Sequence, residues 1–305
     1  MSNNNQLVDI CIITYNQEQF IDECIASTFN QNTNSNVMVH VYDDASSDQT
    51  FERLKKLTPK SKNTSIKINQ NTRNLGVSAN FHQAVKQTES DYIAILEGDD
   101  YWIDPCKLEL QIKAMEQNPK ASFCFTDVWV EKNGKRGDIH PNLGGKTRKF
   151  NAISLADQTG SIAQTCTLLI RRKFLQDLPD WVLNSYTLDW CLQIFLANQG
   201  PAIYIPQITA VYRIHNQGVW SKLDAFEGWR KNLIFYKTVK KKFFKITERK
   251  RIKNRISILI YEALELANIQ FNKKEILYWL IHKFKHSLFT SHKQSLHSMK
   301  LLLSN

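Results

Sequence analysis

Short apolar runs alternate with longer amphipathic segments along the first two thirds of the chain. Val8 to Thr14, Val37 to Tyr42 and Tyr92 to Leu96 have the length and β-branched content of buried strands. Between them, Gln19 to Asn30 and Val77 to Lys86 carry apolar residues at helical spacing. This rhythm predicts an α/β fold, Rossmann-like, with a mainly parallel central sheet and helices on both faces.

The remaining elements follow from the same periodicities. We expect helices over Gln49 to Leu57, Cys106 to Asn118 and Asp189 to Asn198, and strands over residues 65–69, 121–130, 162–170 and 201–205. Residues 134–149 are rich in Gly, Lys and Arg without periodicity, which predicts an exposed loop. In the tail, two apolar helical stretches run over 256–271 and 276–289.

Polar side chains stand where three of the predicted strands end. They are Thr14 and Asn16 after the first strand, Asp43 and Asp44 after the second, and Glu97, Asp99 and Asp100 after the strand that ends at Glu97. Ligands of such sheets collect at the carboxyl ends of the strands. Acid pairs after strands are also common as helix-capping turns. Three polar strand ends at one edge nevertheless favour a nucleotide pocket over simple capping.

The acidic stretch Glu97-Gly98-Asp99-Asp100 follows directly on an apolar strand. Burying ionised carboxylates is costly unless a cation or several donors compensate them. Oxygen ligands on a short loop suit Mg²⁺ or Mn²⁺, which keep several waters and bind substrate phosphates. The alternative is a solvated acidic turn.

Taken together, Ile12-Ile-Thr-Tyr-Asn16, Val41-Tyr-Asp-Asp-Ala-Ser-Ser-Asp48 and Asp91 to Pro105 resemble the nucleotide-sugar domain of inverting family 2 glycosyltransferases with the GT-A fold. The resemblance covers residues 7 to 220. It implies a metal-dependent transferase that moves a sugar from a UDP-sugar, or a dTDP-sugar, to a glycan or lipid-linked glycan in bacterial surface polysaccharide assembly, such as capsule or lipopolysaccharide.

The resemblance also implies roles for the residues at the strand ends. The residues implied to bind the nucleotide sugar are Thr14, Tyr15, Asn16, Asp43 or Asp44, Arg73, Asn74, Glu97, Gly98, Asp99 and Arg213. Asp99 would hold the ribose, and Asp100 would contact the metal ion that bridges the phosphates. Asp99 and His215 are further metal candidates, and Gly98 would allow the backbone to approach the phosphates closely.

A displacement at an anomeric carbon needs a carboxylate that takes the proton from the acceptor hydroxyl. Asp189 stands at a predicted helix start, where the positive end of the helix dipole stabilises an anion. The alternative is a plain acidic residue of a first helical turn. The family places its base at the second of two acidic residues here, and the preceding position is Leu188, so Asp189 is the one candidate.

Charge divides the chain into two regions. Residues 1–220 carry 21 Lys and Arg against 23 Asp and Glu, whereas residues 221–305 carry 19 against 6. We therefore expect a catalytic domain over 1–220 and a basic helical region over 221–305. The basic region either packs on the domain or a second subunit, or contacts an anionic membrane surface through residues 237–289. Its basicity also raises the alternative of a nucleic-acid-binding protein, although no motif of that class is present.

Six cysteines lie at positions 11, 24, 106, 124, 166 and 191, without a CxxC pair or zinc-like spacing. Reduced, buried thiols predict a cytoplasmic protein, peripheral on the inner face of the cell membrane if the basic region binds lipid. No stretch reaches eighteen apolar residues, so no membrane-spanning segment is predicted. The sequence leaves open the sugar, the acceptor, Mg²⁺ against Mn²⁺, and whether the chain forms a homo-oligomer.

Overall fold

The structure is a computed structural model that describes residues 7–59, 61–158, 160–218, 224–242, 245–270 and 272–287. The chain divides into two compact units, Met1–Ser221 and Lys222–Asn305. The sequence-based boundary lay between residues 220 and 221.

The first unit is built on one mixed sheet of ten strands. Their path is β3-β2-β1-β4-β9-β6-β10-β5, with β7 paired to β6 and β8 paired to β10. The strands are β1 (Leu7–Thr14), β2 (Asn36–Asp43), β3 (Thr64–Gln70), β4 (Tyr92–Glu97), β5 (Tyr101–Trp102), β6 (Phe123–Lys132), β7 (Lys135–His140), β8 (Arg148–Phe150), β9 (Leu169–Arg171) and β10 (Ala202–Ile214). β3, β2, β1 and β4 are parallel, as is the pair β6 and β10. The predicted α/β class with a mainly parallel centre is confirmed.

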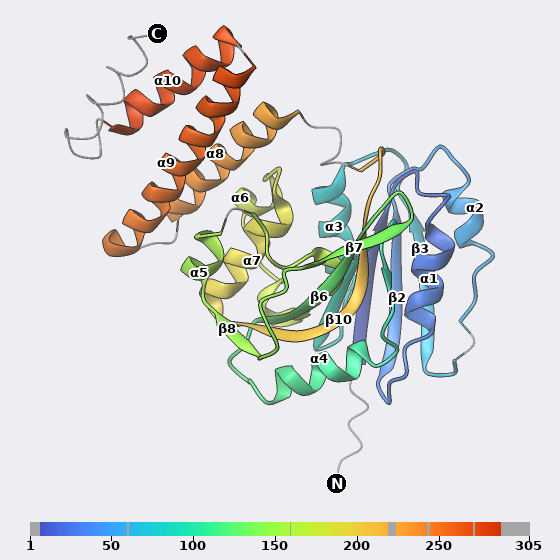
Figure 1. The fold of residues 1–305 in the computed structure, drawn as a ribbon. Helices are drawn as coiled ribbons and strands as arrows, with labels where there is room; N and C mark the ends of the chain where they lie inside the picture. Colours follow the sequence, from blue (N-terminus) through green and yellow to red (C-terminus); the bar gives the residue numbers. More distant parts are fainter. Residues whose placement is uncertain are drawn as a thin grey trace. The chain divides into compact units, whose positions relative to one another are not determined.

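Helices cover both faces of the central parallel strands, which explains why β1, β2 and β4 are mainly apolar, whereas the edge strand β3 carries exposed polar residues. Figure 1 shows α1 (Ile21–Phe29) and α2 (Thr50–Leu54) on one side of β1, β2 and β3, and α3 (Val77–Lys86) on the other. The core between them holds fully buried residues from every layer, including Ile12, Ile25, Val39, Leu96 and Leu54. Shorter helices, α4 (Lys107–Glu116), α5 (Ala152–Ala156), α6 (Asp180–Leu183) and α7 (Leu188–Gln199), complete the unit.

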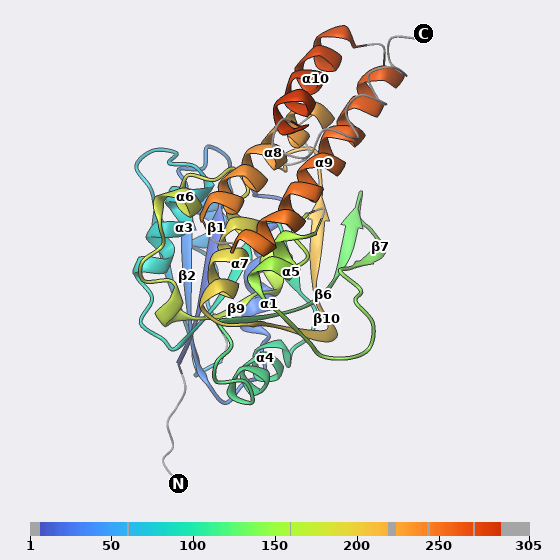
Figure 2. The same ribbon diagram turned by 90° about the vertical axis from the view of Figure 1, so that its left-hand side faces the viewer.

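Two expectations about the second half of this unit were wrong, and one predicted strand is longer than expected. The loop predicted over residues 134–149 contains β7 and part of β8, and in Figure 2 the β6–β7 hairpin lies beside β10. The strand predicted over 162–170 shrinks to β9, because residues 165–167 form a 3-10 turn. The strand predicted over 201–205 is present as the first part of β10, which continues to Ile214 with register shifts near Ile208.

The described residues of the second unit form three helices, α8 (Ala225–Lys242), α9 (Ile246–Ile269) and α10 (Lys273–Ser287). Helix α8 was not predicted, because its buried residues Leu233, Tyr236 and Val239 are interspersed with lysines. Trp279 of α10 is fully buried, and Arg230 of α8 forms an ion pair with Glu275 of α10. None of the helices in the described ranges is long and apolar enough to cross a bilayer.

All six cysteines are free thiols, and only Cys106 is exposed. The expectation of reduced, largely buried thiols therefore agrees with their positions in the fold.

Candidate functional site

Parallel register brings the polar strand ends of the first unit together. Thr14 at the end of β1 pairs with Asp43 at the end of β2, and Ile13 pairs with Glu97 at the end of β4. The backbone amide of Asp44 donates to the carbonyl of Thr14 over 2.9 Å. One edge of the sheet therefore presents residues from three neighbouring strands, the position at which ligands bind in open α/β sheets.

The turn that follows β4 packs tightly against the end of β1. The amide of Gly98 donates to the carbonyl of Ile13 over 3.0 Å, and the amide of Asp100 donates to the carbonyl of Glu97 over 3.0 Å. A Cβ atom at Gly98 would lie 2.6 Å from Oγ1 and 2.8 Å from Cβ of Thr14. The sequence explained Gly98 by an approach to phosphates, whereas the close neighbours in the structure are the side chains of Thr14 and Gln17.

The turn after β1 is bonded to the loop after β2. Asn16 has a positive φ of 53°, and its side-chain oxygen accepts from the amide of Ser47 over 2.8 Å. The amide of Asn16 donates to the hydroxyl of Ser46 over 2.8 Å. The side chain of Tyr15, which directly precedes Asn16, is 46% exposed. The expected donor-binding residues Tyr15 and Asn16 thus lie on a turn with a fixed backbone and one projecting aromatic ring.

Asp43 and Asp44 are both buried, and both carboxylates have donors within the protein. Asp43 accepts from the amide of Ser46 at 3.1 Å and from the side chain of Gln70 at 2.9 Å. Asp44 accepts from the amides of Leu75 and Gly76, each at 2.8 Å. Asp44 therefore fixes the loop between β3 and α3.

That loop carries Arg73 and Asn74, two further residues implied to bind the donor. Both side chains are exposed. Asn71, at the start of the loop, donates from its side-chain amide to Asp44 at 2.7 Å and to Asn80 at 2.9 Å. Asn80 in turn donates to the carbonyl of Tyr42, so this amide chain ties the loop to the end of β2.

The three acidic residues after β4 differ in their surroundings. Asp99 lies 2.8 Å from Nε2 of His215. Asp100 is 1% exposed and accepts from the backbone amide of Arg213 at 2.8 Å. Glu97 has a buried oxygen, Oε2, that has no hydrogen-bond partner within the described residues. The acidic motif is therefore split into an inward Asp100, an Asp99–His215 pair and a partly unsatisfied Glu97.

Burial and mutual repulsion raise the pKa values of two carboxyl groups in this cluster, Glu97 and Asp100. Burial, followed by the charges of Asp99 and Asp189, raises the pKa of Glu97 to about 8. Burial also raises the pKa of Asp100 well above its ordinary value, and the charges of Asp99 and Glu97 add to the effect. A bound cation would relieve this repulsion, and the unpartnered oxygen of Glu97 fits such a site.

The three residues expected to bind a metal ion, Asp99, Asp100 and His215, do not form a ready-made metal site in the structure. Among the described residues, no group of three His, Cys, Asp or Glu side chains is arranged to hold a metal ion. Asp99 and His215 come together, but the carboxylate of Asp100 is bonded to the backbone of β10. Two protein ligands are compatible with Mg²⁺ or Mn²⁺, which complete their shells with water and substrate phosphates.

Asp189 lies in the first turn of α7, as the sequence predicted. Burial raises its pKa, while bonds from the amide of Trp190 and the hydroxyl of Ser161 oppose the rise. Its charge also raises the pKa of Glu97, so the two carboxyl groups lie within electrostatic range of each other. The charge of the candidate base is therefore felt at the acidic turn.

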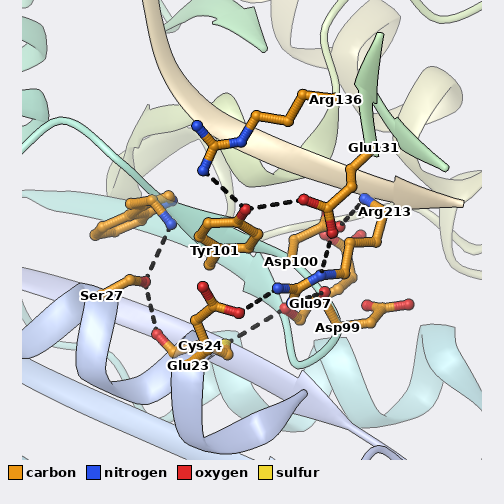
Figure 3. Close-up of polar contacts among 11 residues, drawn as sticks. Glu23, Cys24, Ser27, Glu97, Asp99, Asp100, Tyr101, Glu131, Arg136 and Arg213 are labelled. Carbon is orange, nitrogen blue, oxygen red and sulfur yellow. Dashed lines mark hydrogen bonds and ion pairs between the residues drawn. The ribbon is translucent and has the colours of Figure 1, made fainter. Parts of the chain in front are cut away.

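Arg213 was expected to bind the donor, and the structure gives its guanidinium three protein partners. It pairs with Glu131 at 3.0 Å and with Glu23, and it donates to the carbonyl of Asp99 over 2.8 Å. Figure 3 shows Arg213 between these two glutamates, next to the acidic turn. Neither glutamate was singled out from the sequence, because nothing local marks a residue whose partner is over eighty positions away.

Comparison with known proteins identifies the family. Residues 9–178 match the model of glycosyl transferase family 2. An uncharacterized protein of Mycobacterium tuberculosis is 33% identical over 215 residues, which cover 70% of this chain and 60% of that protein. A UDP-Glc:alpha-D-GlcNAc-diphosphoundecaprenol beta-1,3-glucosyltransferase of Escherichia coli is 31% identical over 128 residues, covering 42% of this chain and 48% of the relative. The chain thus spans about 60% of the length of its mycobacterial relative.

Solved structures show the same fold. The chain is similar to TarS 1-349 of S. aureus in complex with UDP-GlcNAc, with a TM-score of 0.66, 14% identity, and coverage of 89% of this chain and 78% of that one. It is also similar to the mannosyltransferase PcManGT of Pyrobaculum calidifontis, in complex with GDP-Man and Mn²⁺, with a TM-score of 0.60, 12% identity and coverage of 93% and 88%. The expected GT-A fold is confirmed, and this chain belongs to glycosyl transferase family 2.

Proposed function

We propose that this chain is a metal-dependent, inverting glycosyltransferase that moves a sugar from a UDP-sugar to a lipid-linked glycan. The observation that carries the proposal is the acidic turn at the carboxyl edge of the sheet, whose Glu97 has its pKa raised by burial and by the charges of Asp99 and Asp189. In the proposal, the donor diphosphate binds at Asp99 and its sugar points toward Asp189.

The choice of donor and acceptor draws support from the relatives. The glucosyltransferase of Escherichia coli takes its name from UDP-Glc and a GlcNAc-diphosphoundecaprenol acceptor, and the TarS structure contains UDP-GlcNAc. We propose the same classes of substrate here, in the assembly of a bacterial surface polysaccharide, with a dTDP-sugar as the alternative donor.

The cation of the proposal is Mn²⁺ or Mg²⁺, held by Asp99 and His215. When bound, such an ion supplies Lewis-acid stabilisation of the charge that develops on the departing diphosphate. Asp100 would act indirectly. Its carboxylate accepts a hydrogen bond from the backbone amide of Arg213, and this bond would orient the turn that carries Asp99.

Asp189 is the proposed general base. It would accept the proton of the acceptor hydroxyl as that oxygen attacks the anomeric carbon from the side opposite the nucleotide, which inverts the configuration. The first turn of α7 keeps the carboxylate oriented through the amide of Trp190. Burial favours proton uptake because it raises the pKa of Asp189.

The test is a transfer assay with purified protein. We would incubate the chain with UDP-, dTDP- and GDP-sugars, Mn²⁺ and a short-chain diphospholipid-linked GlcNAc, and measure nucleotide diphosphate release. Product stereochemistry by NMR would distinguish inversion from retention. A folded protein that releases no nucleotide diphosphate from any of these donors would refute the proposed activity.

The helical unit offers a surface for the membrane in which such an acceptor lies. Ile234, Leu277 and Ile281 are 65%, 62% and 43% exposed on α8 and α10. Lys237 is exposed, and the positive charge of Lys285 is among the causes that lower its pKa. Apolar side chains beside clustered lysines suit an anionic membrane surface, where each Lys contributes about 1 kcal/mol.

Liposome co-sedimentation tests this surface. We expect binding to vesicles that contain phosphatidylglycerol and not to neutral phosphatidylcholine vesicles, with binding reduced in the Leu277→Ser, Ile281→Ser double variant. A matched control is Ile258→Ser, Ile269→Ser on α9, which removes exposed apolar groups that stand four positions from the acidic Glu262 and Glu265. A salt-sensitive shift of DNA or RNA without vesicle binding would instead favour the nucleic-acid alternative for this region.

A further inference from the structure

Arg213 of β10 contacts two consecutive residues of the acidic turn. Its backbone amide donates to Oδ1 of Asp100 over 2.8 Å, and its guanidinium donates to the carbonyl of Asp99 over 2.8 Å. One contact uses the main chain of β10 and the other uses the side chain. The turn is therefore fixed to β10 at both aspartates, although more than a hundred residues separate them from Arg213.

The guanidinium is itself held on several sides. Nε donates to Glu131 of β6 over 3.0 Å, and one terminal nitrogen pairs with Glu23 of α1. The group also lies 4.2 Å from the ring centre of Tyr101 and 5.2 Å from that of Phe20. The side chain is only 10% exposed. All three guanidinium nitrogens thus have acceptors within the protein.

Glu131 extends these contacts to the β6–β7 hairpin. Its second oxygen accepts from the hydroxyl of Tyr101 over 3.0 Å, and that hydroxyl accepts from Arg136 of β7 over 3.0 Å. Figure 3 shows the continuous path from Glu23 through Arg213, Glu131 and Tyr101 to Arg136. Helix α1, the acidic turn, the hairpin and β10 are therefore joined by one polar network.

We propose that Glu131 and Arg213 are positioning residues that set the acidic turn for the cation and diphosphate of the donor. Glu131 fixes the guanidinium, and the guanidinium fixes the carbonyl of Asp99 beside Asp100. The turn needs such support because its carboxylates repel one another. This inference rests on the proposed function, and it gives Arg213 a role through Asp99 in place of a direct contact with the nucleotide sugar.

The test compares metal-free and metal-dependent binding of UDP by calorimetry. In Glu131→Gln, we expect the Mn²⁺ concentration for half-maximal UDP binding to rise by about tenfold, because a charge-assisted bond is lost. Metal-free UDP binding should stay within about twofold, because Glu131 would not contact the donor. Arg213→Lys should give the same pattern, because lysine keeps the charge but loses the planar fork of donors.

A control variant isolates the network from general effects of charge. Asp22 neighbours Glu23 on α1 and pairs with Arg53 at an exposed position, so Asp22→Asn removes an ion pair from the same helix. We expect Glu23→Gln to raise the Mn²⁺ requirement and Asp22→Asn to leave it unchanged. The double variant Glu131→Gln, Arg213→Lys should be less than additive, because both residues act on one turn.

Equal weakening of UDP binding with and without Mn²⁺ in Glu131→Gln would overturn the inference, and so would an unchanged Mn²⁺ requirement. If Glu131→Gln does not fold, Tyr101→Phe removes only the hydroxyl that contacts Glu131, and an unchanged Mn²⁺ requirement there would overturn the inference as well. The proposed function fails separately, if the wild-type chain binds no nucleotide diphosphate with Mn²⁺.

Discussion

Gly98 lies so close to Thr14 that no side chain fits between them. A Cβ atom at position 98 would stand 2.6 Å from Oγ1 and 2.8 Å from Cβ of Thr14, well inside van der Waals contact. Thr14 is 3% exposed and part of β1, so it has little freedom to move. The contact between the ends of β1 and β4 therefore depends on glycine.

We predict that Gly98→Ala destabilises the protein by about 1–3 kcal/mol, as overpacking of a close-packed site does. The acidic turn would shift away from β1, so binding of UDP with Mn²⁺ should weaken as well. Thermal unfolding and calorimetric titration measure the two effects.

The matched control for this change is Gly145→Ala. A Cβ atom there meets nothing within 4 Å, and its backbone requires no positive φ. Gly145→Ala should leave both measurements unchanged. Equal unfolding temperatures for Gly98→Ala and the wild type would show that β1 yields more easily than its burial indicates.

Asp44→Asn should release the loop that carries Arg73 and Asn74. Asparagine would present an amide N–H₂ to at least one of the amides of Leu75 and Gly76 that now donate to Asp44, leaving a buried donor unsatisfied at about 1–3 kcal/mol. We expect faster hydrogen exchange of these two amides, measured by mass spectrometry or NMR.

Asp138 of β7 is exposed, so Asp138→Asn serves as the comparison for the loss of one acidic charge. Exchange at Leu75 and Gly76 should not change in this variant. Slow exchange of both amides in Asp44→Asn would mean that other contacts hold the loop.

The stability of the ligand-free protein should fall as the pH rises from about 5 to about 8. Over this range folded Glu97, with its pKa raised to about 8, keeps a proton that the unfolded chain releases. The folded state therefore binds more protons, and stability declines by up to about 1.4 kcal/mol per pH unit from this group. Unfolding by urea at several pH values measures the slope.

Glu97→Gln should make this dependence less steep, because glutamine remains neutral throughout, whereas Asp100 and Asp189, whose pKa values are also raised by burial, keep part of the slope. Glu89→Gln changes an exposed glutamate and should preserve the slope of the wild type. The predicted linkage is wrong if the slope in Glu97→Gln equals that of the wild type, since the titration would then belong to other groups.

Asp189→Asn should abolish transfer without abolishing donor binding. Loss of a general base lowers the turnover rate by about 10²–10⁴-fold, whereas the affinity for UDP with Mn²⁺ should stay within about twofold. A coupled assay of UDP release in the presence of acceptor and a separate calorimetric titration distinguish these two quantities.

Asp180→Asn is the corresponding control, because Asp180 is an exposed acidic residue in the first turn of the neighbouring α6. Its rate of transfer should match the wild type. Retention of near wild-type turnover by Asp189→Asn would exclude Asp189 as the base and leave Glu97 as the next carboxyl group to examine.

Local sequence was sufficient for the parallel half of the sheet. Three continuous apolar runs are followed by Asn16, Asp43 and Glu97. Such runs bury both faces and pair their backbone hydrogen-bonding groups as central strands of a parallel sheet. Their polar ends therefore share one edge of the sheet. The first turn of α7, with Asp189, followed for a similar reason, because an apolar helical period begins directly after it.

The antiparallel additions were harder to predict. The residues of β7 lie at an exposed edge, where four of the six residues are exposed, so no apolar alternation distinguishes them from a loop. β9 is a strand of three residues, and residues 165–167 before it form a 3-10 turn instead of extending the strand. Hydrophobic periodicity reports burial, and it carries little information where burial is absent or an element is very short.

The sequence by itself determined the alternation of parallel strands and helices up to β4, the acidic edge of the sheet and the division into a nearly neutral and a basic region. Only the tertiary structure decided which oxygens of that edge remain unpartnered, since Asp44 and Asp100 are bonded internally whereas Glu97 is partly unsatisfied. It also decided that Arg213 meets Glu23 and Glu131. Such contacts join residues up to 190 positions apart, and their geometry exists only after the sheet has formed.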